Sequence, residues 1–157
     1  MTRFAVFGWR SRWAGLAGVA LLAACSTAPP SYKAVLTGEN EVPPVKTSAS
    51  GLSDISMRTG KCTGSYQDCN LLVGTVQTAG VMATAAHIHQ APVGQNGPVI
   101  ITLVQTGTDT WSVPVGTVLT DAQYQAYQKG ELYVNVHSDA YKGGEIRAQL
   151  QPYQPRR

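Results

Sequence analysis

Two segments near the C-terminal end alternate strictly between apolar and polar residues. In residues 132–137 (LYVNVH) and 145–150 (EIRAQL), every second side chain is apolar and aliphatic. Successive side chains of a strand point to opposite faces, so each segment predicts a strand with one face toward the core and the other facing out. The connection 138–144 is rich in turn-forming residues and ends in two glycines. The pattern therefore predicts an antiparallel hairpin.

Other segments carry weaker strand signals and one helix signal. Residues 32–37 alternate, whereas residues 71–76 and 99–104 are short β-branched runs bounded by Gly, Asn or Pro. The segment 120–130 begins with the Thr-x-x-Gln spacing of a capping box and ends at a glycine. Many short strands with one short helix predict a mainly β fold, an immunoglobulin-like or Greek-key β-sandwich or barrel.

The N-terminal residues have the composition of an export signal. Three arginines precede an apolar run over residues 13–24, which is too short to span a bilayer. The run ends in Leu-Ala-Ala-Cys25, and small residues before a cysteine form a lipobox. We therefore expect residues 1–24 to be a signal peptide and Cys25 to be the lipid-bearing first residue of a mature bacterial lipoprotein. The alternative is an ordinary secretory signal followed by a chance cysteine.

This interpretation divides the chain and gives it a location. Residues 25–31 are expected to be a lipidated tether, residues 32–152 a folded domain, and residues 153–157 a C-terminal tail. Ser26 occupies the position where aspartate is associated with retention in the inner membrane. We therefore expect a protein of the cell envelope, anchored to the outer membrane by the lipid on Cys25 and facing the periplasm.

The excess positive charge lies in the expected signal peptide. The full sequence has 12 basic and 9 acidic residues, a net charge of +3, and three of its arginines precede residue 13. The mature chain is therefore neutral. It also lacks a basic cluster, which argues against nucleic acid as a partner.

Cys62 and Cys69 are the cysteines that remain once Cys25 carries a lipid. A local disulfide is expected for such a pair in an oxidising, exported compartment. Metal binding by the pair is the alternative, but the two residues lack the short spacing common in thiolate sites.

Three histidines are the only ones in the chain. His87-Ile88-His89 continues an alternating stretch, so a strand would point both imidazoles to one face, with α-carbons about 7 Å apart. His137 lies on the outward face of the predicted strand 132–137. If these strands are neighbours, three imidazoles can reach one ion at metal–nitrogen distances of about 2.0–2.1 Å.

The predicted hairpin also places Glu145 opposite His137. This pairing keeps Val136 with Ile146 on the core side. Glu145 is then a fourth ligand or the acceptor of an imidazole N–H. Copper is the expected ion because the compartment is exported and no thiolate is free, with zinc as the alternative. The opposing interpretation is that all three histidines are surface polar residues.

Two loop segments flank the expected site. Glu41 precedes Val-Pro43-Pro44, where the missing N–H groups would end strand pairing, and it either caps that strand end or approaches the histidine face. The segment 94–98 (GQNGP) predicts a tight turn with positive φ at glycine or asparagine, which would shape the rim of the site.

Motifs spread over nearly the whole mature chain resemble the CHRD domain, which is named from chordin. They are LTGENEVPPV at 36–45, Gly51, HIHQAPVGQNGPV at 87–99, GELYVNVH at 130–137 and GGEIR at 143–147. The resemblance implies an all-β, immunoglobulin-like or Greek-key architecture and no settled activity. Chordin antagonises growth factors outside the cell, a role that does not carry over to a bacterial lipoprotein.

The His-Ile-His element is also similar, locally, to the copper-ligand strand of copper/zinc superoxide dismutases. Those enzymes use additional histidines, including one that bridges two metals, so a dinuclear centre is not expected in a chain with three.

Three functions are compatible with these patterns. The first is copper binding through His87, His89 and His137, for storage, delivery or tolerance, with no catalysis assigned. The second is a metal-free β-sandwich that binds an envelope protein or polysaccharide, which imidazoles lying far apart would favour. The third is a mononuclear copper redox enzyme, which additionally needs an open coordination position and a substrate channel.

Overall fold

The strands of the chain form one antiparallel sheet, seen in a computed structural model that describes residue 1 and residues 33–62 and 68–152. The expected signal peptide beyond Met1, Cys25, the tether and the tail at 153–157 lie outside the described residues. The strand order is β5-β4-β8-β9-β1-β2-β3-β7-β6. The elements are β1 (Lys33–Thr37), η1 (Gly38–Asn40), β2 (Ser50–Lys61), β3 (Asp68–Ala79), β4 (Ala83–Gln90), β5 (Val99–Thr102), β6 (Val104–Gly107), β7 (Thr110–Ser112), α1 (Asp121–Gln128), β8 (Leu132–Ser138) and β9 (Ile146–Gln149).

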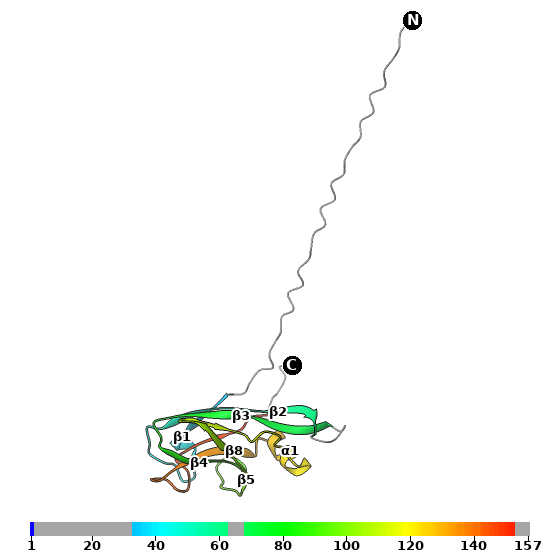
Figure 1. Ribbon diagram of the computed structural model, residues 1–157. Coiled ribbons are helices and arrows are strands. Elements are labelled where there is room, and N and C mark those ends of the chain that lie inside the picture. Colours follow the sequence, from blue (N-terminus) through cyan, green and yellow to red (C-terminus); the bar gives the residue numbers. More distant parts are fainter. Residues whose placement is uncertain (2–32, 63–67, 153–157) are drawn as a thin grey trace.

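The sheet curls until its two edges approach each other. Strands β5 and β6 stand at opposite ends of the strand order, yet only Leu103 separates them in the sequence. Leu103 is buried, and its N–H donates to the carbonyl of Ala86 on β4 at 2.9 Å. The result is a nearly closed barrel or sandwich, with β2 and β3 on one side and β4, β5 and β8 on the other (Figure 1). The predicted mainly β fold is confirmed.

The C-terminal hairpin forms with the predicted register. Val134 pairs with Ala148 and Val136 pairs with Ile146, and all four side chains are buried in the core. They pack there with aliphatic and aromatic side chains from the rest of the barrel, among them Leu36, Ile55, Leu72, Val76, Ile88, Trp111, Tyr127, Leu132 and Leu150.

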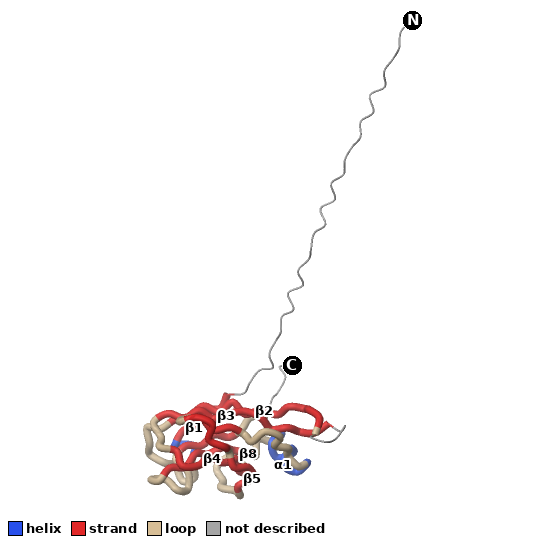
Figure 2. Tube along the Cα trace, in the orientation of Figure 1, coloured by secondary structure: helices blue, strands red, loops and turns tan. Residues whose placement is uncertain are grey.

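The one α-helix among the described residues, α1, begins where the capping box predicts. The Thr120 hydroxyl accepts the N–H of Gln123, and the Gln123 side chain accepts the N–H of Thr120. Gly130 follows the helix with a φ of +71°, which favours glycine. The helix stands out as the short blue segment beside the strands (Figure 2). No helix of the described residues is long and apolar enough to cross a membrane.

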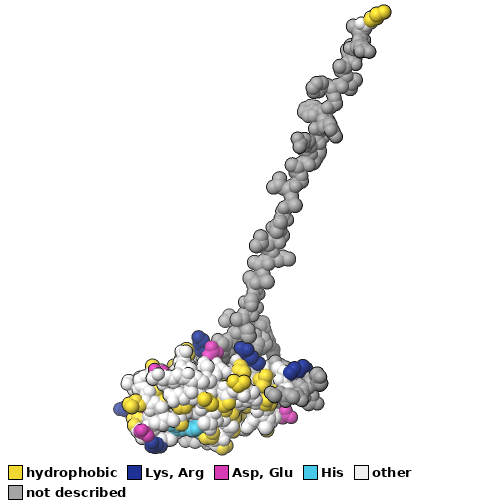
Figure 3. Space-filling view, in the orientation of Figure 1, with side chains coloured by type: hydrophobic (Ala, Val, Ile, Leu, Met, Phe, Trp, Pro, Cys, Tyr) yellow, Lys and Arg dark blue, Asp and Glu magenta, His cyan; other side chains and the backbone are white. Residues whose placement is uncertain are grey.

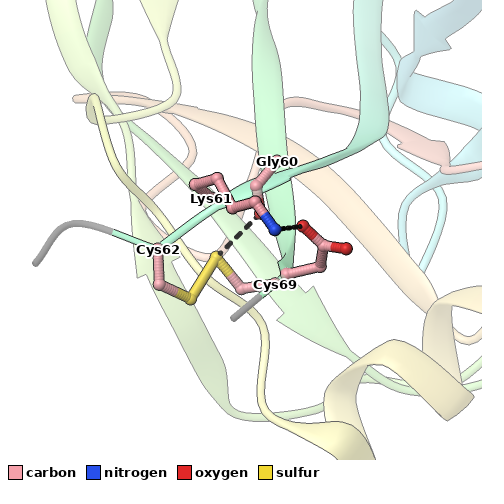
Figure 4. Close-up of a disulfide and its surroundings, with 5 residues drawn as sticks. Gly60, Lys61, Cys62 and Cys69 are labelled. Atoms are coloured by element: carbon pink, nitrogen blue, oxygen red, sulfur yellow. Dashed lines mark hydrogen bonds and ion pairs between the residues drawn. A yellow bond between two sulfur atoms is a disulfide. The ribbon is translucent and has the colours of Figure 1, made fainter. Parts of the chain in front are cut away.

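A disulfide joins the two strands at the loop end of the long β2–β3 hairpin (Figure 4). Cys62 and Cys69 have α-carbons 5.6 Å apart, and the neighbouring pair Lys61 and Asp68 forms an exposed ion pair of 2.8 Å. The residues between them, 63–67, lie outside the described part of the chain. The predicted pairing of the two cysteines is confirmed.

Removing this disulfide should lower stability modestly. In the double variant Cys62→Ser/Cys69→Ser, we expect the free energy of unfolding to fall by about 2 kcal/mol, because the bond restricts a short loop in the unfolded chain. Urea unfolding of both proteins measures the difference. Reduced wild-type protein is the control and should match the variant. Equal stability of variant and oxidised wild type would show that the bond adds nothing.

Candidate metal centre

The three histidines lie on the outer face of two neighbouring strands. His87 and His89 belong to β4 and His137 to β8, and the antiparallel register pairs His87 with Asn135 and His137 with Ala85. The ligand atoms of the three imidazoles lie within 4.8 Å of one another. Histidine reaches the surface as a small patch of cyan (Figure 3). The structure therefore brings together the three histidines that the sequence singles out, and they could hold a metal ion.

The distances between the ring nitrogens are close to those between two ligands of one metal ion. His87 Nδ1 and His137 Nε2 are 2.9 Å apart and form a hydrogen bond, in which His137 Nε2 accepts. Two nitrogens at 2.0–2.1 Å from one ion would be about 2.9 Å apart at a right angle and about 4.2 Å apart on opposite sides. The ligand atoms of the three rings lie within 4.8 Å of one another. Because this limit slightly exceeds about 4.2 Å, the rings must move closer together to bind one ion.

Backbone carbonyls fix the tautomers of two rings. His89 Nδ1 lies 2.9 Å from the Gly97 carbonyl, and His137 Nδ1 lies 3.0 Å from the Lys142 carbonyl. Because a carbonyl only accepts, each Nδ1 carries the hydrogen and each Nε2 holds a lone pair. His89 Nε2 is buried and has no hydrogen-bond partner among the described residues. A lone pair that is buried without a donor is suited to a metal.

The surroundings favour the neutral form of these rings. Burial lowers the pKa of His87, and the neighbouring His137 and His89 lower it further. Burial also lowers the pKa of His137, partly offset by the hydrogen bond to the Lys142 carbonyl. Both rings are therefore neutral near pH 7, the form that metal ligation requires.

Glu145 is not part of this group of ligands. Its Oε1 accepts the hydroxyl of Thr47 at 2.7 Å, which turns the carboxylate toward the loop that follows η1. The acceptor for the His137 N–H is the Lys142 carbonyl. The hairpin register was predicted correctly, but an alternation pattern cannot show where a long side chain finds its hydrogen bond.

The outward face of β8 and β9 is covered, contrary to the expectation that it faces out. Tyr133, Asn135 and Arg147 are only 2%, 3% and 2% exposed. Loop residues cover them, including Glu41 and the turn at 94–98, and a hydrogen bond from Asn96 to the Val42 carbonyl joins these two loops. The tight turn was predicted, and Gly94 has a φ of +79°, but the position of these loops was not, because they have no periodic pattern.

Glu41 lies against the outer face of β8, where its carboxyl group contacts Asn135. Its side chain is buried beside Gly144, where an added Cβ would lie 2.5 Å from Oε1. Burial raises the pKa of Glu41 to about 7, although the charge of Arg147 and hydrogen bonds from the Val42 backbone and Asn135 act in the opposite direction.

This raised pKa makes stability pH-dependent. The unfolded chain releases the Glu41 proton above about pH 4.5, whereas the folded chain holds it until about pH 7. Stability is therefore lost as the pH rises through this window, by at most about 3 kcal/mol. We expect Glu41→Gln to remove this loss, so that its stability relative to wild type increases from pH 4.5 to 8. Urea unfolding across the range measures it; a constant difference between the proteins would contradict the assignment.

Comparison with known proteins agrees with the fold and adds a family. The model of the CHRD domain family matches residues 32–150, which include the nine strands of the described part of the chain and the three histidines. No curated protein and no solved structure matches the chain. Because the family match covers most of the sequence, the chain belongs to the CHRD domain family.

Proposed function

We propose that this CHRD domain binds one transition-metal ion through His87, His89 and His137, and that the ion is copper. The observation that carries the proposal is the convergence of three imidazoles whose ligand atoms lie within 4.8 Å. Two of them have their Nε2 lone pairs preset by backbone carbonyls. This convergence favours metal binding. A metal-free binding module would be favoured if the three imidazoles lay far apart.

The donor set supports copper over zinc. Both cysteines in the described residues are in the disulfide, so the donors of the group are imidazole nitrogens. Without a free thiolate, which is a common ligand of structural zinc, a set of imidazole nitrogens in an exported protein favours copper. Three protein ligands leave a position open for water or for a partner that receives the ion. Storage, delivery or tolerance are the roles that fit such a site, and no catalytic step is proposed.

The proposal predicts one Cu(II) per chain. We expect elemental analysis of the purified protein to give a ratio near 1 after copper loading, and the variants His87→Ala/His89→Ala and His137→Ala to lose the ion. Asp139→Asn is a matched control, because Asp139 is an exposed residue close to His137 that pairs with Lys142. Unchanged copper binding in the histidine variants would disprove the site, and a preference for zinc would correct the metal.

We also propose that the protein is a lipoprotein anchored in the outer membrane through Cys25. The support is sequence alone: the three arginines, the apolar run 13–24, the lipobox that ends at Cys25, and Ser26 after it. The anchor would hold the metal centre in an oxidising compartment.

The anchor predicts where the protein is found after cell fractionation. We expect wild-type protein in the outer-membrane fraction, labelled by a radioactive fatty acid, and Cys25→Ser protein unlabelled and released from the membrane. An unlabelled wild type would show that the segment is an ordinary secretory signal.

A further inference from the structure

His89 is held by a chain of contacts that begins at Arg147. We propose that Arg147 is a positioning residue of the metal centre, which fixes the ring of His89 through the turn at residues 95–97. The inference rests on the proposed metal site and adds a residue that does not touch the ion. Each link of the chain is a contact between described residues.

The first link joins Arg147 to the turn. Arg147 lies on the outer face of β9, and its Nη2 donates to the Gln95 carbonyl at 2.8 Å while its Nη1 donates to Asn96 Oδ1 at 3.1 Å. A planar guanidinium that makes two such bonds at once fixes the direction of both acceptors. Asn96 Nδ2 in turn donates to the Val42 carbonyl at 2.6 Å, which joins the turn to the neighbouring loop.

The second link is the backbone of Gly97. Its carbonyl accepts the Nδ1 hydrogen of His89 at 2.9 Å, and its N–H donates to the hydroxyl of Tyr133 at 3.2 Å. A Cβ at Gly97 would lie 2.0 Å from the Gln90 carbonyl, so the turn packs directly against the end of β4. Arg147 therefore acts on His89 through the two residues that immediately precede Gly97.

The third link is the ring of Tyr133. His89 stacks on it with ring centroids 4.8 Å apart and an interplanar angle of 7°. The Arg147 guanidinium carbon lies 3.3 Å from the centre of the same ring. Because β4 and β9 flank β8, the two groups occupy opposite faces of Tyr133. The His89 ring thus has a fixed plane from Tyr133 and a fixed tautomer from Gly97.

Loss of the hydrogen bonds from Arg147 to the turn should allow His89 to change its tautomer. Without a fixed Gly97 carbonyl, the hydrogen can move to Nε2, and the lone pair then no longer faces His87 and His137. Changes to the groups that orient a metal-binding histidine typically weaken affinity 10–100-fold. This weakening should depend on the planar guanidinium, because a lysine would keep the positive charge but lose the paired N–H donors.

The test compares Arg147→Lys with Gln149→Ala in the chain from residue 25 onward, with Cys25→Ser in every protein. Gln149 lies on the same face of β9, but its side chain donates to the carbonyls of Ala91 and Gly130 and not to residues 95–97. Gln149→Ala loses two hydrogen bonds to loops and Arg147→Lys loses at least one, so a general loss of stability affects both. Asn96→Ala, which leaves Arg147 in place, is a second variant in case Arg147→Lys fails to fold.

Two measurements are made on each protein. Imidazole nitrogen NMR of the metal-free protein reports the tautomer of His89, and a competition titration gives the dissociation constant for Cu(II). We expect wild type and Gln149→Ala to hold the hydrogen on Nδ1 and to bind copper alike. Arg147→Lys should show a mixture of tautomers and at least tenfold weaker binding, with Asn96→Ala changed in the same direction by less.

The outcomes distinguish the positioning role of Arg147 from the existence of the metal site. If wild type binds copper and Arg147→Lys matches it in tautomer and affinity, the positioning role is overturned while the metal site stands. Equal weakening in Arg147→Lys and Gln149→Ala, with unchanged tautomers, also overturns it, because the effect is then only structural. If wild type binds neither copper nor zinc, the proposed function fails, and the positioning role fails with it.

Discussion

The antiparallel pairing of β4 with β8 is the interaction on which the candidate metal centre depends. Its register places Ala86 opposite Val136 and Ile88 opposite Val134 on the core side, and all four side chains are fully buried. A shift by one residue would expose them, so burial fixes the register strongly. The same register leaves no choice for the other face, where His87, His89 and His137 must lie together.

Strands place the histidines, whereas turns orient them. The carbonyls that hold the two Nδ1 hydrogens belong to Gly97 and Lys142, both outside regular strands. The turn at Gly97 is held against the barrel by Arg147 and Tyr133. The outer face of β8 and β9 is consequently a second buried layer, polar in composition, under loops that cover it. Because burial raises the pKa of Glu41 to about 7, its carboxyl group is buried in this layer without a full negative charge near pH 7.

Much of this arrangement follows from local sequence, and the remainder from contacts between distant residues. Alternation predicts the β8–β9 hairpin and the shared face of His87 and His89, and the Thr120 capping box predicts α1. The neighbourhood of β4 and β8 is not predictable in this way, because it depends on how the barrel closes. Strand β2 was not predicted, because its sequence (SGLSDISMRTGK) is largely polar; it pairs with β3 along its whole length and with β1 over residues 50–54. The burial of Arg147 and the hydrogen bond between Thr47 and Glu145 depend on loops. These loops have no periodic pattern from which their position could be predicted.

The number of imidazoles bound to Cu(II) in the loaded protein tests the proposed metal centre directly. Pulsed EPR of protein labelled with ¹⁵N-histidine counts them through their coupling to the unpaired electron. The structure predicts three, falling to two when His137 is replaced by alanine. One imidazole or none in wild-type protein, or a spectrum that His137→Ala leaves unchanged, would contradict a metal centre built from His87, His89 and His137.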